Sequence, residues 1–127
     1  MMSRKIISIH IAVHPAGRGM ANCSWKEDGE VEGGHLSGDN PPFVHIDKRQ
    51  FPKETIELIW KEAMALDEAV LSLDIGPDPN WKGHTELSIT FDTGKAMRIC
   101  WPFGDEGMDP RVQKLVELVM KHRIGCW

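Results

Sequence analysis

Cys100 carries the most direct chemical potential in this chain, because a thiol becomes a strong nucleophile once it loses its proton. Alternation along residues 97–101 places Cys100 beside Arg98 on one face of a predicted strand, where the cation favours the thiolate. A cysteine nucleophile also needs a general base, which His10 or His14 on the same sheet face would supply. The competing interpretation, which we favour, is that Cys100 is a small residue that fills a strand position.

His10 and His14 are the other residues whose spacing could do chemistry. They lie on one face of a predicted strand, which places their rings about 13 Å apart at ~3.3 Å per residue. Zinc binds nitrogen at about 2 Å, so both rings cannot ligate one ion unless a bulge or the turn at Pro15 folds His14 back. None of the six histidines shows the His-Glu-x-x-His spacing of a zinc site. We therefore predict solvated histidines, no metal site and no cofactor.

The five tryptophans, in a chain without tyrosine, offer possible contact residues. Trp25, Trp60 and Trp101 fall at predicted core positions. Trp81 lies in a loop rich in proline and glycine, and Trp127 is the last residue, so neither has an evident place in the core. Exposed tryptophans are frequent in interface hot spots. Trp81 and Trp127 are therefore either contacts with a subunit or partner protein, or side chains that fold back onto the domain.

Charge and cysteine usage limit the class of partner. The formal net charge is -4 and no run of cations is longer than Lys48-Arg49, whereas a surface for nucleic acid needs clustered Lys and Arg. The three cysteines lie far apart without a Cys-x-x-Cys pair, so we expect free thiols in a reducing cytoplasm. No apolar segment is long enough to span a bilayer. We expect neither nucleic acid nor membrane as a partner.

Side-chain periodicity predicts the elements that position these residues. Residues 6–14 alternate, with Ile7, Ile9, Ile11 and Val13 pointing to an apolar face and His10 and His14 to a polar one. A hairpin with its turn at Asp28-Gly29 follows, and Gly33-Gly34 marks either a bulge or the end of its second strand. The chain therefore begins with an antiparallel sheet that has one apolar and one polar face.

A loop, a short extended piece at Phe43-Val44-His45-Ile46 and then a helix are expected after this sheet. Asp47 and Gln50 form a predicted capping pair, Pro52 suits the first helical turn, and an apolar stripe continues to about Leu66. Residues 69–73 form a short apolar run that fits either a strand or a last turn of helix.

A second hairpin and helix repeat the plan. Strands at 87–91 and 97–101 flank a turn at Thr93-Gly94, and Asp109-Pro110 starts a helix with its own apolar stripe. We therefore predict one α+β domain over residues 1–127, with an antiparallel sheet of about five strands and two helices packed on one face.

This order of elements resembles a group of small bacterial α+β domains of unknown function. The likeness is carried by Glu27-Asp28-Gly29-Glu30-Val31, by Phe51-Pro52-Lys53-Glu54 and by the hairpin from Leu87 to Trp101. Such domains often carry a Gly-x-Cys-Pro element before the second strand, and Gly19-Met20-Ala21-Asn22-Cys23-Ser24 departs from it. The resemblance implies a fold and no activity, so it assigns no role to any residue.

Helices on one side leave the other face of the sheet open for a ligand, a partner protein or a second subunit. We predict a binding or interaction module that self-associates as a homo-oligomer, has no chemistry of its own, and binds through His10, His14, Arg98 and Cys100, with Trp81 and Trp127 at the margins. The alternative is a small enzyme, a hydrolase or a metal-dependent activity, that uses Cys100 or the pair His10 and His14. The predicted open face comprises Ser8, His10, Asn22, Ser24, Lys26, Glu86, Ser88, Thr90, Arg98 and Cys100.

Overall fold

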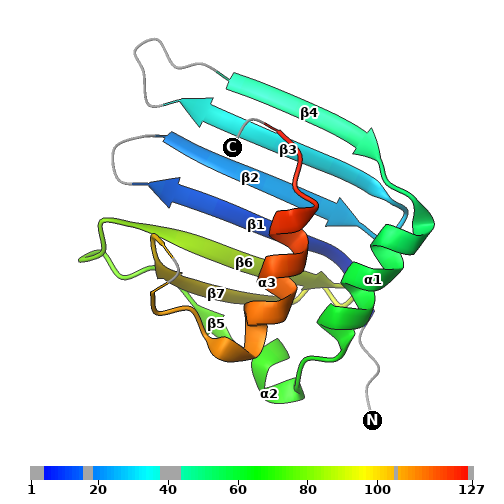
Figure 1. The fold of residues 1–127 in the computed structure, drawn as a ribbon. Helices are drawn as coiled ribbons and strands as arrows, with labels where there is room; N and C mark the ends of the chain where they lie inside the picture. The colour runs from blue at the N-terminus through cyan, green and yellow to red at the C-terminus, as the bar shows by residue number, and fades with distance from the viewer. Residues whose placement is uncertain (1–4, 16–18, 38–43, 105, 126–127) are drawn as a thin grey trace.

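The computed structural model describes residues 5–15, 19–37, 44–104 and 106–125. Figure 1 shows one broad sheet with helices lying across it. In chain order the elements are β1 (Ile6–Pro15), β2 (Gly19–Lys26), β3 (Glu30–Ser37), β4 (Val44–Gln50), α1 (Lys53–Met64), α2 (Glu68–Leu71), β5 (Asp74–Ile75), β6 (Gly83–Phe91), β7 (Ala96–Pro102), the 3-10 helix η1 (Pro110–Val112) and α3 (Gln113–Lys121).

The α+β class is confirmed, but the predicted sheet and number of helices are wrong. Over the described ranges, one mixed sheet holds seven strands in the order β4-β3-β2-β1-β6-β7-β5, and the chain forms three α-helices. Neighbouring strands among β4, β3, β2, β1, β6 and β7 pair antiparallel, whereas the two-residue β5 pairs parallel with β7. The additional strands β4 and β5 form the two sheet edges. Residues 69–73 form no strand, because most of them belong to α2 and the turn after it.

A register shift in β1 decides which isoleucine is buried. The pairing of β1 with β6 slips between Ile6 and Ser8, so Ile6 is 5% exposed and Ile7 is 42% exposed. The alternation predicted Ile7 on the apolar face, and this is wrong because an irregularity in the ladder interrupts the alternation of faces. From Ile9 onward the predicted alternation is confirmed, and Ile9 and Ile11 are fully buried.

Strand β3 continues through Gly33 and Gly34, contrary to the predicted bulge or end. A Cβ at Gly33 would collide with the carbonyl oxygen of Ile124, so glycine allows the segment after α3 to cross the sheet in backbone contact. Asp47 and Gln50 lie within β4 and pair with β3, so the predicted capping pair is also wrong. Extended backbone is favoured before Pro52, and α1 begins directly after it without a side-chain cap.

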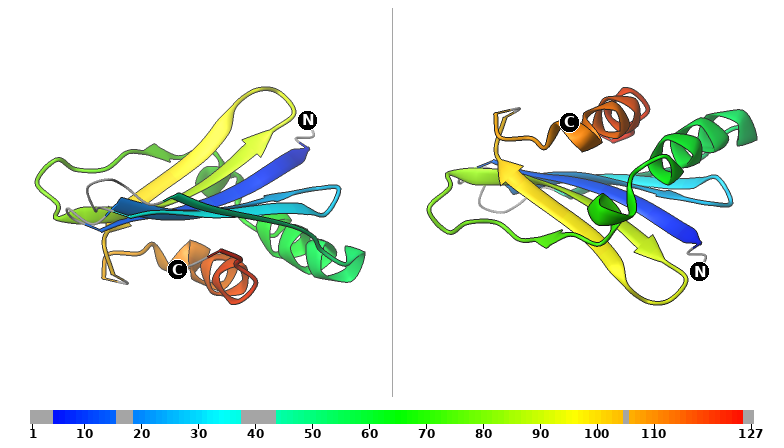
Figure 2. Two further views of the ribbon diagram at one scale, coloured as in Figure 1. Left: turned by 90° about the horizontal axis from the view of Figure 1, so that it is seen from above. Right: turned by 90° about the horizontal axis from the view of Figure 1, so that it is seen from below.

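Figure 2 shows α1 and α3 against the same face of the sheet, as predicted. Each helix buries one stripe: Ile56, Ile59, Trp60 and Ala63 on α1, and Leu115, Val116 and Val119 on α3. The indole Nε1 of Trp60 donates a hydrogen bond to the carbonyl of Ile6 at 3.0 Å and joins α1 to the start of β1. Among the described residues, no helix is long and apolar enough to cross a membrane.

Candidate functional site

The ten predicted residues of the open face do share one face of the sheet. Residues that are directly opposite on paired strands point the same way. His10 pairs with Ser24 on one side and with Ser88 on the other, and Ser88 in turn pairs with Arg98. The remaining positions follow from the pairs Ser8–Lys26, Ser8–Thr90, Ala12–Asn22, Ala12–Glu86 and Glu86–Cys100.

Glu86 is the centre of the polar network on this face. The Cys100 thiol donates a hydrogen bond to Glu86 Oε1 at 3.5 Å, and Arg98 Nη1 lies 3.7 Å from the same oxygen. Arg98 also donates from Nε to Asp74 Oδ1 at 3.0 Å, across the parallel pair of β7 and β5. The predicted neighbours Arg98 and Cys100 are therefore linked through a carboxylate that faces them from β6.

The Cys100 thiol stays protonated at neutral pH. Burial and, to a smaller extent, the carboxylate of Glu86 raise its pKa to about 12, and the cation of Arg98 acts in the opposite direction but is outweighed. The residue is only 5% exposed. Arg98 has the predicted influence on the thiol, but the thiolate needed by a nucleophile does not form.

The histidines of the open face form a row beside this network. The rings of His14 and His84 stack with centroids 4.4 Å apart and an interplanar angle of 17°. Burial lowers the pKa of His10 below its usual value, with Glu86 raising it and His14 lowering it to smaller extents. Burial and His14 likewise lower the pKa of His84, with Glu86 raising it. In the described part of the chain, no three His, Cys, Asp or Glu side chains converge to hold a metal ion.

Trp81 is half-buried at the β7 end of the sheet. It lines a shallow hollow of about 470 Å³ together with Ile75, Cys100, Trp101 and Pro102. It therefore folds back against the sheet edge while part of its ring remains accessible. Trp127, the second predicted contact residue, lies outside the described residues.

The opposite end of the open face is apolar. Leu36, Val44 and Ile46 are 36%, 59% and 60% exposed. Leu36 pairs with Val44, Gly34 pairs with Ile46, and Met20 pairs with Leu36, so these side chains form one patch over β2, β3 and β4. We call Met20, Leu36, Val44 and Ile46 the apolar patch. It surrounds a hollow of only about 180 Å³.

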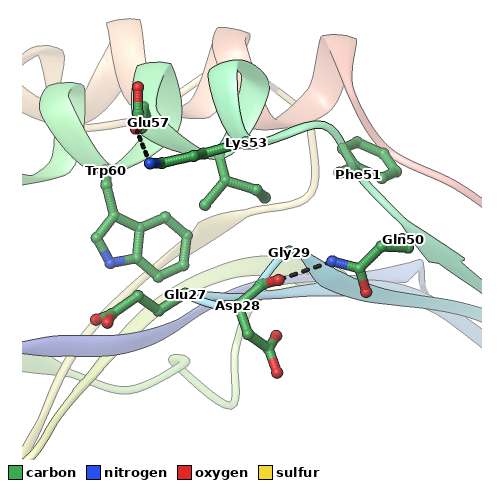
Figure 3. Close-up of a pocket in the computed structure, with 9 residues that line it drawn as sticks. Glu27, Asp28, Gly29, Gln50, Phe51, Lys53, Glu57 and Trp60 are labelled. Atoms are coloured by element: carbon green, nitrogen blue, oxygen red, sulfur yellow. Dashed lines mark hydrogen bonds and ion pairs between the residues drawn. The ribbon is translucent and has the colours of Figure 1, made fainter.

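A separate cleft of about 500 Å³ opens between the β2–β3 turn and α1 (Figure 3). Four residues spaced as i, i+3, i+4 and i+7 on α1, namely Lys53, Ile56, Glu57 and Trp60, form one wall. The opposite wall is the Asp28-Gly29 turn, held in place where Gln50 Nε2 donates to the carbonyl of Asp28 at 2.7 Å. The one lysine of this lining already pairs with Glu57 at 3.7 Å. The cleft can hold a small apolar group beside carboxylates, and no histidine or cysteine is among the described residues that line it.

Sequence reasoning missed Glu86 as the hub, the stack of His14 on His84, the apolar patch and the α1 cleft. Glu86 was placed on the correct face, and the hairpin register would have set it opposite Cys100. The patch required knowing that a strand over 44–50 pairs with β3, whereas the sequence indicates only a short extended piece at 43–46 followed by a helix cap at Asp47. No family model and no curated protein matches this chain. Its function must therefore be inferred from the site itself.

Proposed function

We propose that the protein is a binding module that takes a protein partner on its open face and self-associates as a homo-oligomer, with no chemistry of its own. The observation that carries this proposal is the two-part character of the open face. Hydrogen-bonded and paired polar groups around Glu86 occupy one end, and the exposed apolar patch occupies the other. Polar groups that orient a partner next to apolar area that can be buried are the usual parts of a protein interface.

The shape of this face supports a large, flat ligand. Its hollows measure about 300 Å³ around His10, Asn22 and Ser24, and about 180 Å³ at the apolar patch. Small-molecule sites measure roughly 300 to 1,000 Å³ and enclose most of their ligand, so the larger of these two hollows only reaches the lower end of that range. A protein surface would cover both ends at once.

The alternative of a hydrolase or metal-dependent enzyme has weaker support. Its candidate nucleophile, Cys100, has a pKa of about 12 and is buried. The second candidate group, His14, presents one ring face to His84. Buried free thiols at Cys23 and Cys100 also support our assignment of the protein to the reducing cytoplasm.

The test is binding by variants of the open face. Ser24→Arg combined with Ser88→Arg places two bulky cations on either side of His10, and we expect affinity for the partner to fall at least about tenfold. The partner is first captured by crosslinking in the native cell and identified, and its affinity for the purified protein is then measured by calorimetry. Leu58→Arg combined with Met64→Arg is the matched control, because these α1 side chains are exposed away from the sheet core. Equal loss in both variants, or loss in the control alone, contradicts the proposal.

A further inference from the structure

Strand β4 ends the sheet with an open edge. Among the described strands it pairs with β3 alone, and Figure 1 shows it as the outermost strand on its side. Its side chains Val44 and Ile46 are 59% and 60% exposed. A sheet edge with exposed apolar side chains is a template for pairing with another strand.

The charges on β4 do little to protect this edge. Charged residues on an edge strand normally discourage pairing with a second chain. Here Lys48 Nζ lies 3.8 Å from Glu32 Oε2, and Arg49 Nη2 lies 3.1 Å from Asp47 Oδ2. Both cations are therefore balanced by carboxylates of the same chain.

We propose that two copies of this chain pair antiparallel through β4 about a two-fold axis at Ile46, so that their two sheets become one. The inference rests on the self-association included in the proposed function and names the surface that performs it. A two-fold interface must be complementary to itself. If one residue contacts a second residue across the axis, the copy of the first residue contacts the second residue of the other chain in the same way. The sequence of β4 meets this condition in the register centred on Ile46.

In this register the opposite residues between Val44 and Lys48, all of them described by the structure, are compatible. Ile46 meets Ile46 of the second copy, and Val44 meets the aliphatic stem of Lys48, all on the open face. His45 meets Asp47 on the helix-covered face, where the carboxylate accepts a hydrogen bond from the imidazole. The two apolar patches then adjoin across the axis, which removes apolar area from water.

Neighbouring registers are less favourable. Centring the pair on Asp47 sets two carboxylates against each other, and centring it on Lys48 does the same with two ammonium groups. Centring it on His45 opposes two imidazoles and moves Asp47 away from His45. Charge complementarity therefore selects Ile46 as the residue on the axis.

Disulfide crosslinking tests the register directly. In a background with Cys126→Ser, Ile46→Cys is expected to form a disulfide with its own copy under mild oxidation, because directly opposite residues come within disulfide reach. Lys48→Cys is the matched control on the same strand and face. It lies roughly 13 Å from its copy in this register, at ~3.3 Å per residue, so its yield should be at least about tenfold lower. A mixture of Val44→Cys and Lys48→Cys chains should crosslink to each other.

Sedimentation velocity of the unmodified full chain over a wide concentration range gives the complementary result. We expect a dimer that Ile46→Asp dissociates, since two carboxylates would meet on the axis, and that Leu58→Asp on α1 leaves intact. A dimer that crosslinks at Lys48 or at a His45→Cys variant but not at Ile46 overturns the register centred on Ile46 and leaves self-association standing. A chain that remains monomeric overturns both, while partner binding on the open face is judged separately by the Ser24 and Ser88 variants.

Discussion

The Cys100 thiol lies 3.5 Å from Oε1 of Glu86, and this contact determines the chemistry at the polar end of the open face. Burial of the thiol and, second to it, this carboxylate keep the proton on sulfur, since a thiolate would be poorly solvated and would face a negative charge at close range. The same carboxylate oxygen forms an ion pair with Arg98, whose Nη1 lies 3.7 Å away. Glu86 thus joins a cysteine and an arginine that look like a reactive pair into a network of a hydrogen bond and an ion pair.

Glu86→Gln should make Cys100 more acidic. Removing the charge leaves Arg98 as the nearest ionic influence, so the thiol pKa should fall from about 12 and alkylation should begin at lower pH. The measurement is the rate of iodoacetamide labelling of Cys100 against pH, resolved by peptide mass spectrometry. Glu32→Gln on the same face should leave this profile unchanged. An unaltered profile in Glu86→Gln would show that burial alone sets the pKa.

Gly33→Ala should destabilise the fold, whereas Gly34→Ala should not. A methyl group at Gly33 meets the backbone of Ile124, which must move away, so the free energy of unfolding should fall by about 1 to 3 kcal/mol. At Gly34 the nearest atom, Asn22 Oδ1, lies 3.4 Å from the added carbon, an ordinary contact. Urea denaturation of both variants checks this difference. Equal stability of the two would mean that the segment at Ile124 does not depend on close contact with β3.

These two glycines also show how far the sequence could be read. Both hairpins, the helical stripes and the ten residues of the open face were predictable, because side-chain periodicity is a local property. The need for glycine at Gly33 arises from Ile124, far away in the chain, and no local pattern reports such a contact. The slip between Ile6 and Ser8 depends likewise on pairing with β6. Long-range register is the information that a single sequence does not contain.

The site was predictable to the same extent. Placing His10, His14, Arg98 and Cys100 on one face required only alternation. The partners of these residues lie on other strands, as His84 does for His14. The apolar patch was missed because Asp47 and Pro52 are typical of a helix start, although the strand continues to Gln50.

Protonation of His10 should destabilise the protein at mildly acidic pH. Burial lowers its pKa below 6.5 in the folded state, so just below pH 6.5 the unfolded chain binds more protons and stability rises with pH. The free energy of unfolding should therefore increase between about pH 5 and about pH 7. His10→Asn should flatten this part of the curve, while Ser88→Ala on the neighbouring strand should keep the slope of the unmodified protein. An unchanged slope in His10→Asn would assign the pH dependence to other groups.

Asp109→Asn should lose stability at neutral pH and match the unmodified protein in acid. Asp109 caps η1 by accepting a hydrogen bond from the backbone amide of Arg111. Its Oδ2 also accepts a hydrogen bond from Nη2 of the Arg111 guanidinium at 2.7 Å. Asparagine retains the cap, so the variant isolates the charge. Arg111 lowers the pKa of Asp109 below 3.8, and the resulting stability is present above that pH and disappears as the pH falls through the folded pKa.

Because the pair is partly exposed, we expect a loss of roughly 0.2 to 1 kcal/mol, reduced by salt. Urea denaturation at neutral and acidic pH measures it, and adding Arg111→Gln to Asp109→Asn should cost nothing more. A loss that persists unchanged in acid would instead reflect the geometry of the cap.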